Sequence, residues 1–84
     1  MKISLLYFGR PREHLGVSSE MVDVPDGIAT LGELLEWLRL RGENWANELA
    51  DKRVRCAINQ EFCALASPVH EKDEVAIFSP ISGG

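Results

Sequence analysis

The residues with the clearest chemical potential are the last six of the sequence, Ser79-Pro80-Ile81-Ser82-Gly83-Gly84. Pro80 has no N–H for a strand ladder and the two glycines have no Cβ, so this segment should be narrow and extended. A carboxylate is a weak electrophile, but adenylation converts it into an acyl donor. We therefore expect the Gly84 carboxylate to be the chemical site, on a tail that enters another protein's active site. The alternative is an inert tail.

Other residue types that often carry chemistry lack the neighbours that such chemistry needs. His14 and His70 have no ligand at metal-binding spacing, which predicts exposed histidines and no metal site. Cys56 and Cys63 would lie opposite each other across a predicted hairpin, an arrangement that would permit a disulfide. Two reduced strand residues are the preferred interpretation in a cytoplasmic protein. We expect neither thiol to be catalytic, because no basic residue is evident that would lower its pKa.

Length and charge restrict the class of protein and its partners. A chain of 84 residues has room for one domain. The net charge of -4 and the scattered Lys and Arg argue against nucleic-acid binding. No apolar stretch approaches the roughly 18 residues of a membrane span, and no signal peptide precedes the first strand pattern. We expect a cytoplasmic protein that binds neither nucleic acid nor a membrane.

The elements that must position the tail are predicted from hydrophobic periodicity. Thr30-Leu31-Gly32-Glu33 has the form of a capping box, which indicates a helix beginning there. Leucines follow it at i, i+3, i+4 and i+7, and Gly42 stands where a C-terminal cap belongs. A short second helix is expected over 44–50, and residues 12–16 should form a turn or helical loop. Strands are expected over 2–8, 17–24, 54–58, 61–65 and 74–78.

These elements predict an α+β domain, a mixed sheet with one main helix packed on one face. The domain should span 1–78, with 79–84 as a flexible C-terminal tail. Strand alternation places one set of apolar residues under the helix: Ile3, Leu5, Tyr7, Val54, Cys56, Ile58, Val75 and Ile77. It places a second set on the uncovered face: Leu6, Phe8, Ala57, Phe62, Ala76 and Phe78. Exposed aromatics indicate a protein interface, unless the loop 9–16 or the Trp45 segment covers them.

Three segments carry a resemblance that spans nearly the whole chain: Leu5-Leu6-Tyr7-Phe8-Gly9 with Arg12-Glu13, Ala57-Ile58-Asn59-Gln60-Glu61-Phe62, and 73–84. In them the chain resembles the ubiquitin-like β-grasp sulfur carriers, and among these the small subunits of molybdopterin synthase. Family members commonly carry two prolines after the final aromatic residue, and here Ser79 replaces the first. The resemblance implies a ubiquitin-like β-grasp fold.

The resemblance also implies a mechanism. An E1-like adenylating enzyme would use ATP to activate the Gly84 carboxylate. A sulfur donor of the desulfurase or rhodanese type would then convert it to a thiocarboxylate. The carrier would insert Pro80, Ile81, Ser82 and Gly83 into the large subunit of molybdopterin synthase, forming a heterotetramer, and donate sulfur to cyclic pyranopterin monophosphate. Catalytic residues would belong to the large subunit, and the domain itself would bind no cofactor.

The same resemblance assigns partner binding to the aromatic positions Phe8, Phe62 and Phe78, together with Leu6 and Arg12. Three alternatives remain open from the sequence. The first is a sulfur carrier for thiamine or for tRNA thiolation, although thiamine carriers usually lack the segment 42–52. The second is a ubiquitin-like modifier conjugated to lysines. The third is an interaction module with an inert tail.

Overall fold

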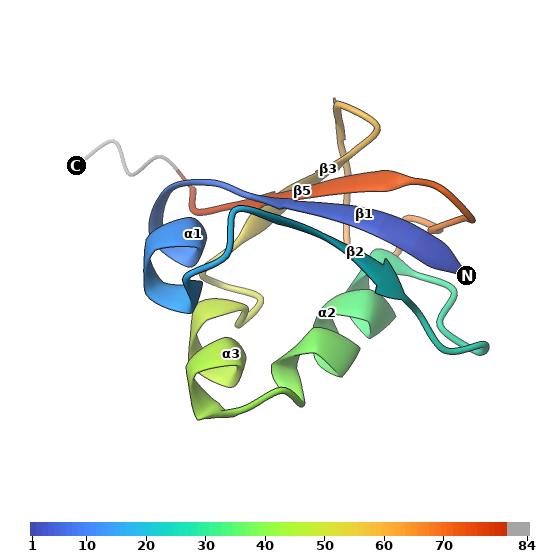
Figure 1. Ribbon diagram of the computed structural model, residues 1–84. Coiled ribbons are helices and arrows are strands. Elements are labelled where there is room, and N and C mark those ends of the chain that lie inside the picture. The colour runs from blue at the N-terminus through green and yellow to red at the C-terminus, as the bar shows by residue number, and fades with distance from the viewer. Residues whose placement is uncertain (81–84) are drawn as a thin grey trace.

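The computed structural model describes residues 1–80. Its sheet has the strand order β2-β1-β5-β3-β4; β1 pairs with β5 in parallel and the other pairs are antiparallel. All three helices lie on one side of this sheet, as Figure 1 shows. The elements are β1 (Lys2–Tyr7), α1 (Gly9–Leu15), β2 (Ser19–Asp23), α2 (Leu31–Arg39), α3 (Glu43–Glu48), β3 (Arg55–Ile58), β4 (Glu61–Phe62) and β5 (Glu74–Phe78). The expected α+β architecture is confirmed.

Helix α2 begins at the predicted capping box. The Thr30 hydroxyl accepts a hydrogen bond from the Glu33 N–H at 3.2 Å, and a Glu33 carboxylate oxygen accepts one from the Thr30 N–H at 3.1 Å. The prediction that Gly42 caps the C-terminus of this helix is wrong. Helix α2 ends at Arg39 with Leu40 as its cap, because the N–H groups of the next two residues turn back to carbonyls three positions earlier. Gly42 instead caps the N-terminus of α3.

The hydrophobic core lies between the sheet and α2. Every leucine of the predicted helical stripe is buried, and so is the covered sheet face except Ile58, which is half-buried. Helix α3 adds Leu49 just beyond its end, whose side chain is also fully buried. The hydrophobic core therefore lies on the side of the sheet that alternation predicted, under α2.

Strand β4 is shorter than predicted, ending at Phe62 where the sequence indicated Leu65. The backbone beyond it has other partners: the Ala64 N–H donates to the Ser67 hydroxyl, and the Leu65 carbonyl accepts from the Gly32 N–H at 2.9 Å. Strand β2 likewise begins at Ser19, and the loop after β1 forms the helix α1.

The turn between β3 and β4 sets the register of the hairpin. Asn59 and Gln60 both have positive φ, 51° and 72°, which is the geometry of a two-residue type I′ hairpin. The Asn59 side chain also donates to the buried Asp73 carboxylate at 2.9 Å, which ties the turn to the segment before β5. Ala57 therefore lies opposite Phe62, as predicted.

Candidate functional site

The sheet face away from α2 is here called the open face, and its apolar residues are Leu6, Phe8, Ala57, Phe62, Ala76 and Phe78. The register places four of them in one row across four strands, because Leu6 pairs with Ala76, Ala76 with Ala57 and Ala57 with Phe62. Phe8 follows β1, and its N–H donates to the Ile77 carbonyl at 2.9 Å. Residues from four separate strands thus form one apolar surface.

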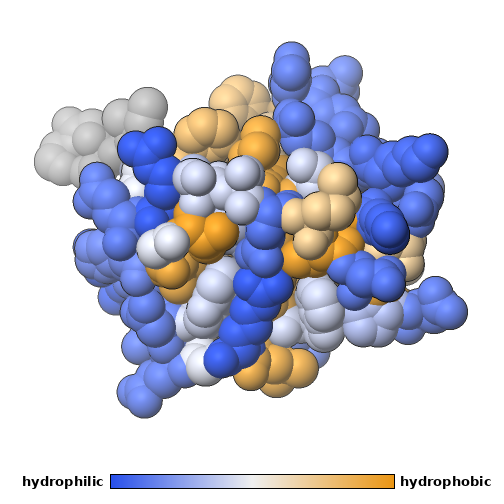
Figure 2. Space-filling view, in the orientation of Figure 1, coloured by the Kyte–Doolittle hydropathy of each residue, from blue (hydrophilic) through white to orange (hydrophobic). Residues whose placement is uncertain are grey.

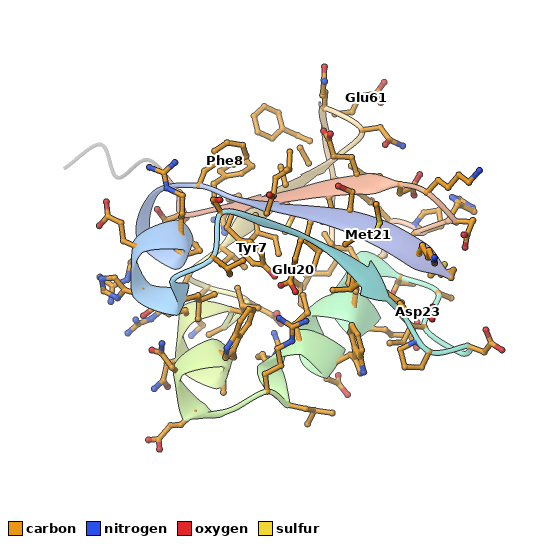
Figure 3. The ribbon with its side chains drawn as sticks, viewed as in Figure 1. Tyr7, Phe8, Glu20, Met21, Asp23 and Glu61 are labelled. Carbon is orange, nitrogen blue, oxygen red and sulfur yellow. The ribbon has the colours of Figure 1, made fainter. Side chains whose placement is uncertain are left out.

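The aromatic rings of the open face differ in exposure. Phe62 is 86% exposed and Phe8 is 46% exposed, whereas Phe78 is half-buried. Figure 3 shows Phe8 projecting from the sheet on the side opposite Tyr7. In Figure 2, apolar side chains reach the surface along the upper side of the molecule, away from the helices. The sequence prediction that Phe8 and Phe62 are exposed is confirmed. Phe78 was predicted to be exposed as well, but its side chain is only partly exposed.

Neither segment that could have covered the open face does so. The ring of Trp45 packs edge-on against Tyr7, with ring centroids 5.9 Å apart, on the side that faces the core. Helix α1 lies at one end of the sheet beside α3, and its buried residue is Pro11. The open face is therefore accessible to another protein. Arg12, also predicted to bind a partner, is exposed on α1.

The predicted tail leaves the domain beside this face. Strand β5 ends at Phe78, and Ser79 and Pro80 are half-buried. A Cβ placed on Gly9, whose φ is +61°, would lie 3.6 Å from the Ser79 hydroxyl oxygen. The chain after β1 and the chain after β5 are therefore close neighbours. The predicted site at Gly84, and the tail positions Ile81, Ser82 and Gly83, lie outside the described residues.

A hydrogen-bonded cluster that the sequence did not predict lies on the covered side of the sheet. The Tyr7 hydroxyl donates to Glu20 at 2.8 Å, and Arg41 donates to both carboxylate oxygens of Glu20 at 2.8 and 3.1 Å. The Arg41 guanidinium also lies 4.5 Å from the centre of the Trp45 ring. Burial alone would raise the pKa of Glu20, but the hydrogen bonds from Arg41 and Tyr7 together hold it below its usual value.

A second cluster joins α1 to α3. The carboxylate of Glu48 is buried and contacts Arg10 at 3.1 Å, His14 at 3.2 Å and Arg53 at 4.0 Å. His14 is exposed as predicted, but its contact with Glu48 was missed, since their positions are 34 residues apart. The contacts of Arg10 and His14 with Glu48 hold α1 against α3, next to the start of the tail.

The two cysteines are free thiols. Burial, reinforced by the neighbouring Cys63, raises the pKa of Cys56 to about 12, and burial also raises the pKa of Cys63. Thiols with raised pKa values are poor nucleophiles at neutral pH. Among residues 1–80, no group of three or more His, Cys, Asp or Glu side chains could hold a metal ion, and no helix is long and apolar enough to cross a membrane.

A mixed five-stranded sheet with one main helix across one face defines a ubiquitin-like β-grasp domain. The solved structure of SAMP1 from Haloferax volcanii shares this fold, with a TM-score of 0.76 and 31% identity over the whole of both chains. A complex of subunits 1 and 2 of the molybdopterin-converting factor from Helicobacter pylori includes a chain with a TM-score of 0.67. At 19% identity over both full chains, this likeness shows the fold alone.

Similarity in sequence shows the family to which the chain belongs. The model of the ThiS family matches residues 5–84. The chain is 35% identical to the molybdopterin synthase sulfur carrier subunit of Haemophilus influenzae over 82 residues, which cover 98% of this chain and 99% of the relative. The subunit of the same name from Escherichia coli is 30% identical, with the same coverage. The chain belongs to the ThiS family.

Proposed function

We propose that this protein is the sulfur carrier subunit of a molybdopterin synthase. The full-length similarity to two subunits of that name supports the assignment. The single structural observation that carries it is the open face, where Phe8 and Phe62 are exposed next to the point at which the chain leaves β5. A partner docked on these rings would be in position to receive the residues that follow Pro80.

The proposed reaction uses the carboxylate of Gly84. An E1-like enzyme with ATP forms an acyl-adenylate and releases pyrophosphate. The persulfide of a sulfur donor of the desulfurase or rhodanese type then displaces AMP to give an acyl disulfide, and a thiol reductant cleaves its S–S bond, which leaves the thiocarboxylate on the carrier and forms a disulfide with the donor thiol. The thiocarboxylate sulfur then attacks cyclic pyranopterin monophosphate in the active site of the large subunit. The chain itself supplies the nucleophilic sulfur and a docking surface, while ATP binds to the activating enzyme and the catalytic residues belong to the large subunit.

Reconstitution tests this proposal. The thiocarboxylated protein is mixed with the purified large subunit and cyclic pyranopterin monophosphate, and molybdopterin is measured as its fluorescent oxidised derivative. We expect product in proportion to the thiocarboxylate supplied, and none from the unmodified carrier. Thiocarboxylated protein that binds the large subunit yet transfers no sulfur to the pterin would contradict the assignment.

The likeness to SAMP1 favours one second candidate, a ubiquitin-like modifier. One solved structure of that protein is described as small archaeal modifier protein 1, and it is 30% identical to this chain. The activated Gly84 would then form an isopeptide bond with a lysine of another protein. Tagged protein recovered from its host under denaturing conditions distinguishes the two candidates, because a modifier would appear in covalent adducts of higher mass and a carrier would not.

A further inference from the structure

The arginines of the chain divide into two groups according to their partners. Four of the six contact a carboxylate within the chain: Arg10 and Arg53 contact Glu48, Arg39 contacts Asp51, and Arg41 contacts Glu20. Within residues 1–80 the other two, Arg12 and Arg55, have no carboxylate at ion-pair distance. The family resemblance already assigns Arg12 to partner binding. Arg55 is therefore the arginine that has neither a carboxylate partner within residues 1–80 nor an assigned role.

Arg55 lies on the open face. It is the first residue of β3 and is directly opposite Phe78 in the antiparallel pair with β5, so the two side chains share one face of the sheet. Phe78 in turn packs against Phe62. The side chain of Arg55 is exposed, and its one hydrogen bond runs from a terminal nitrogen to the adjacent Val54 carbonyl at 2.9 Å. Most of its five N–H groups therefore remain available.

A protein that covers Phe62 and Phe78 must also displace water around Arg55. Removing water from a guanidinium without supplying an acceptor is costly, and the planar fork of arginine is best matched by a carboxylate that accepts two hydrogen bonds. This reasoning rests on the proposed function, since it assumes that the open face is where the large subunit docks.

We propose that Arg55 is a specificity-determining contact, which pairs with an Asp or Glu of the large subunit next to the site where that subunit covers Phe62 and Phe78. The net charge of -4 draws the carrier toward a basic surface. One carboxylate within such a surface, aligned with Arg55, fixes the orientation of the docked domain. That orientation determines where the residues after Pro80 enter the partner.

Affinity measurements with the purified large subunit test this contact. The variants are Arg55→Glu, Arg55→Gln and the control Lys52→Glu, which makes the same charge change at an exposed turn between α3 and β3. We expect Arg55→Glu to weaken binding at least tenfold and Arg55→Gln to weaken it less. Lys52→Glu should stay within about twofold of the parent.

Phe62→Arg, measured in parallel, separates the contact from the docking face. If Phe62→Arg weakens binding while Arg55→Glu matches Lys52→Glu, the Arg55 contact is wrong and the docking face stands. If neither Phe62→Arg nor Arg55→Glu weakens binding, both the face and the contact are wrong. Thermal melting of each variant confirms that a loss of affinity does not come from unfolding.

Discussion

The ring of Phe62 meets the ring of Phe78 in an edge-to-face contact, with centroids 6.0 Å apart and planes at 64°. The two residues come from strands that are not neighbours, since β3 lies between β4 and β5. Phe62 is almost fully exposed, whereas Phe78 is half-buried. The two rings therefore form one protruding unit, and a partner that covers one must contact the other.

Charge placed in this aromatic unit should weaken partner binding. Phe78→Arg removes a ring that contributes to both the edge-to-face contact and the docking surface, and a buried aromatic anchor is worth about 2 kcal/mol or more in an interface. We expect at least a tenfold loss of affinity for the large subunit and for the activating enzyme, measured by isothermal titration calorimetry. Leu40→Arg is the control. Leu40 is 80% exposed, but it follows α2, which lies on the side of the sheet away from the open face. Equal affinities of the two variants for both partners would place the interface elsewhere.

The hydroxyl of Tyr7 should influence both stability and the titration of Glu20. Tyr7→Phe removes one hydrogen bond from a partly buried carboxylate, so the variant should lose about 1 kcal/mol of unfolding free energy at pH 7 in urea denaturation. Because the folded-state pKa of Glu20 lies below its usual 4.5, its stabilising contribution is present above that pH and is lost as the pH falls through the lowered pKa.

In Tyr7→Phe this acid-induced loss should begin at a higher pH than in the parent, because one of the interactions that lower the pKa is gone. Carbon-detected NMR of the Glu20 carboxyl group follows the titration directly. An unchanged titration midpoint in Tyr7→Phe would show that Arg41 alone controls the pKa of Glu20.

Replacement of Gly32 by alanine should not stabilise the protein, although helix propensity alone favours alanine by about 1 kcal/mol. A Cβ on Gly32 would lie 3.2 Å from the Leu65 carbonyl oxygen, which accepts a hydrogen bond from the Gly32 N–H. The backbone after β4 would have to shift. We expect Gly32→Ala to be no more stable than the parent in urea denaturation. A gain of about 1 kcal/mol would mean that the loop moves away freely.

The sequence predicted those features that depend on neighbouring residues. Alternation assigned Phe8 and Phe62 to the uncovered face because the period of a strand involves only adjacent positions and one tight turn. The capping box at Thr30 followed for the same reason. The ion pairs of Glu20 and Glu48 could not be predicted, because they depend on how elements far apart in the sequence pack together. The end of α2 was misplaced because a glycine can cap either end of a helix.

Cys56 and Cys63 should be dispensable, because the proposed sulfur is carried on the terminal carbonyl group. With a pKa of about 12, Cys56 is almost entirely protonated at pH 8 and should react with iodoacetamide far more slowly than free cysteine. The double variant Cys56→Ala, Cys63→Ala should fold and donate sulfur at the parental rate in the reconstituted reaction. A folded double variant that transfers no sulfur would place the sulfur on a thiol.

The proposed function depends on the position of the Gly84 carboxylate. Adding one alanine after Gly84 moves the carboxylate by about 3.5 Å, which exceeds what bond formation tolerates, and deleting Gly84 withdraws it by the same amount. Both changes come after β5, the last strand of the described residues, so we expect both variants to melt like the parent and to bind the large subunit normally.

The decisive measurement is the intact mass of the parent and of both tail variants after incubation with the activating enzyme, ATP and a sulfur source. We expect the parent to gain the mass difference of sulfur replacing oxygen and neither variant to do so. If the lengthened or the shortened chain acquires a thiocarboxylate as readily as the parent, the assignment of Gly84 as the chemical site is wrong.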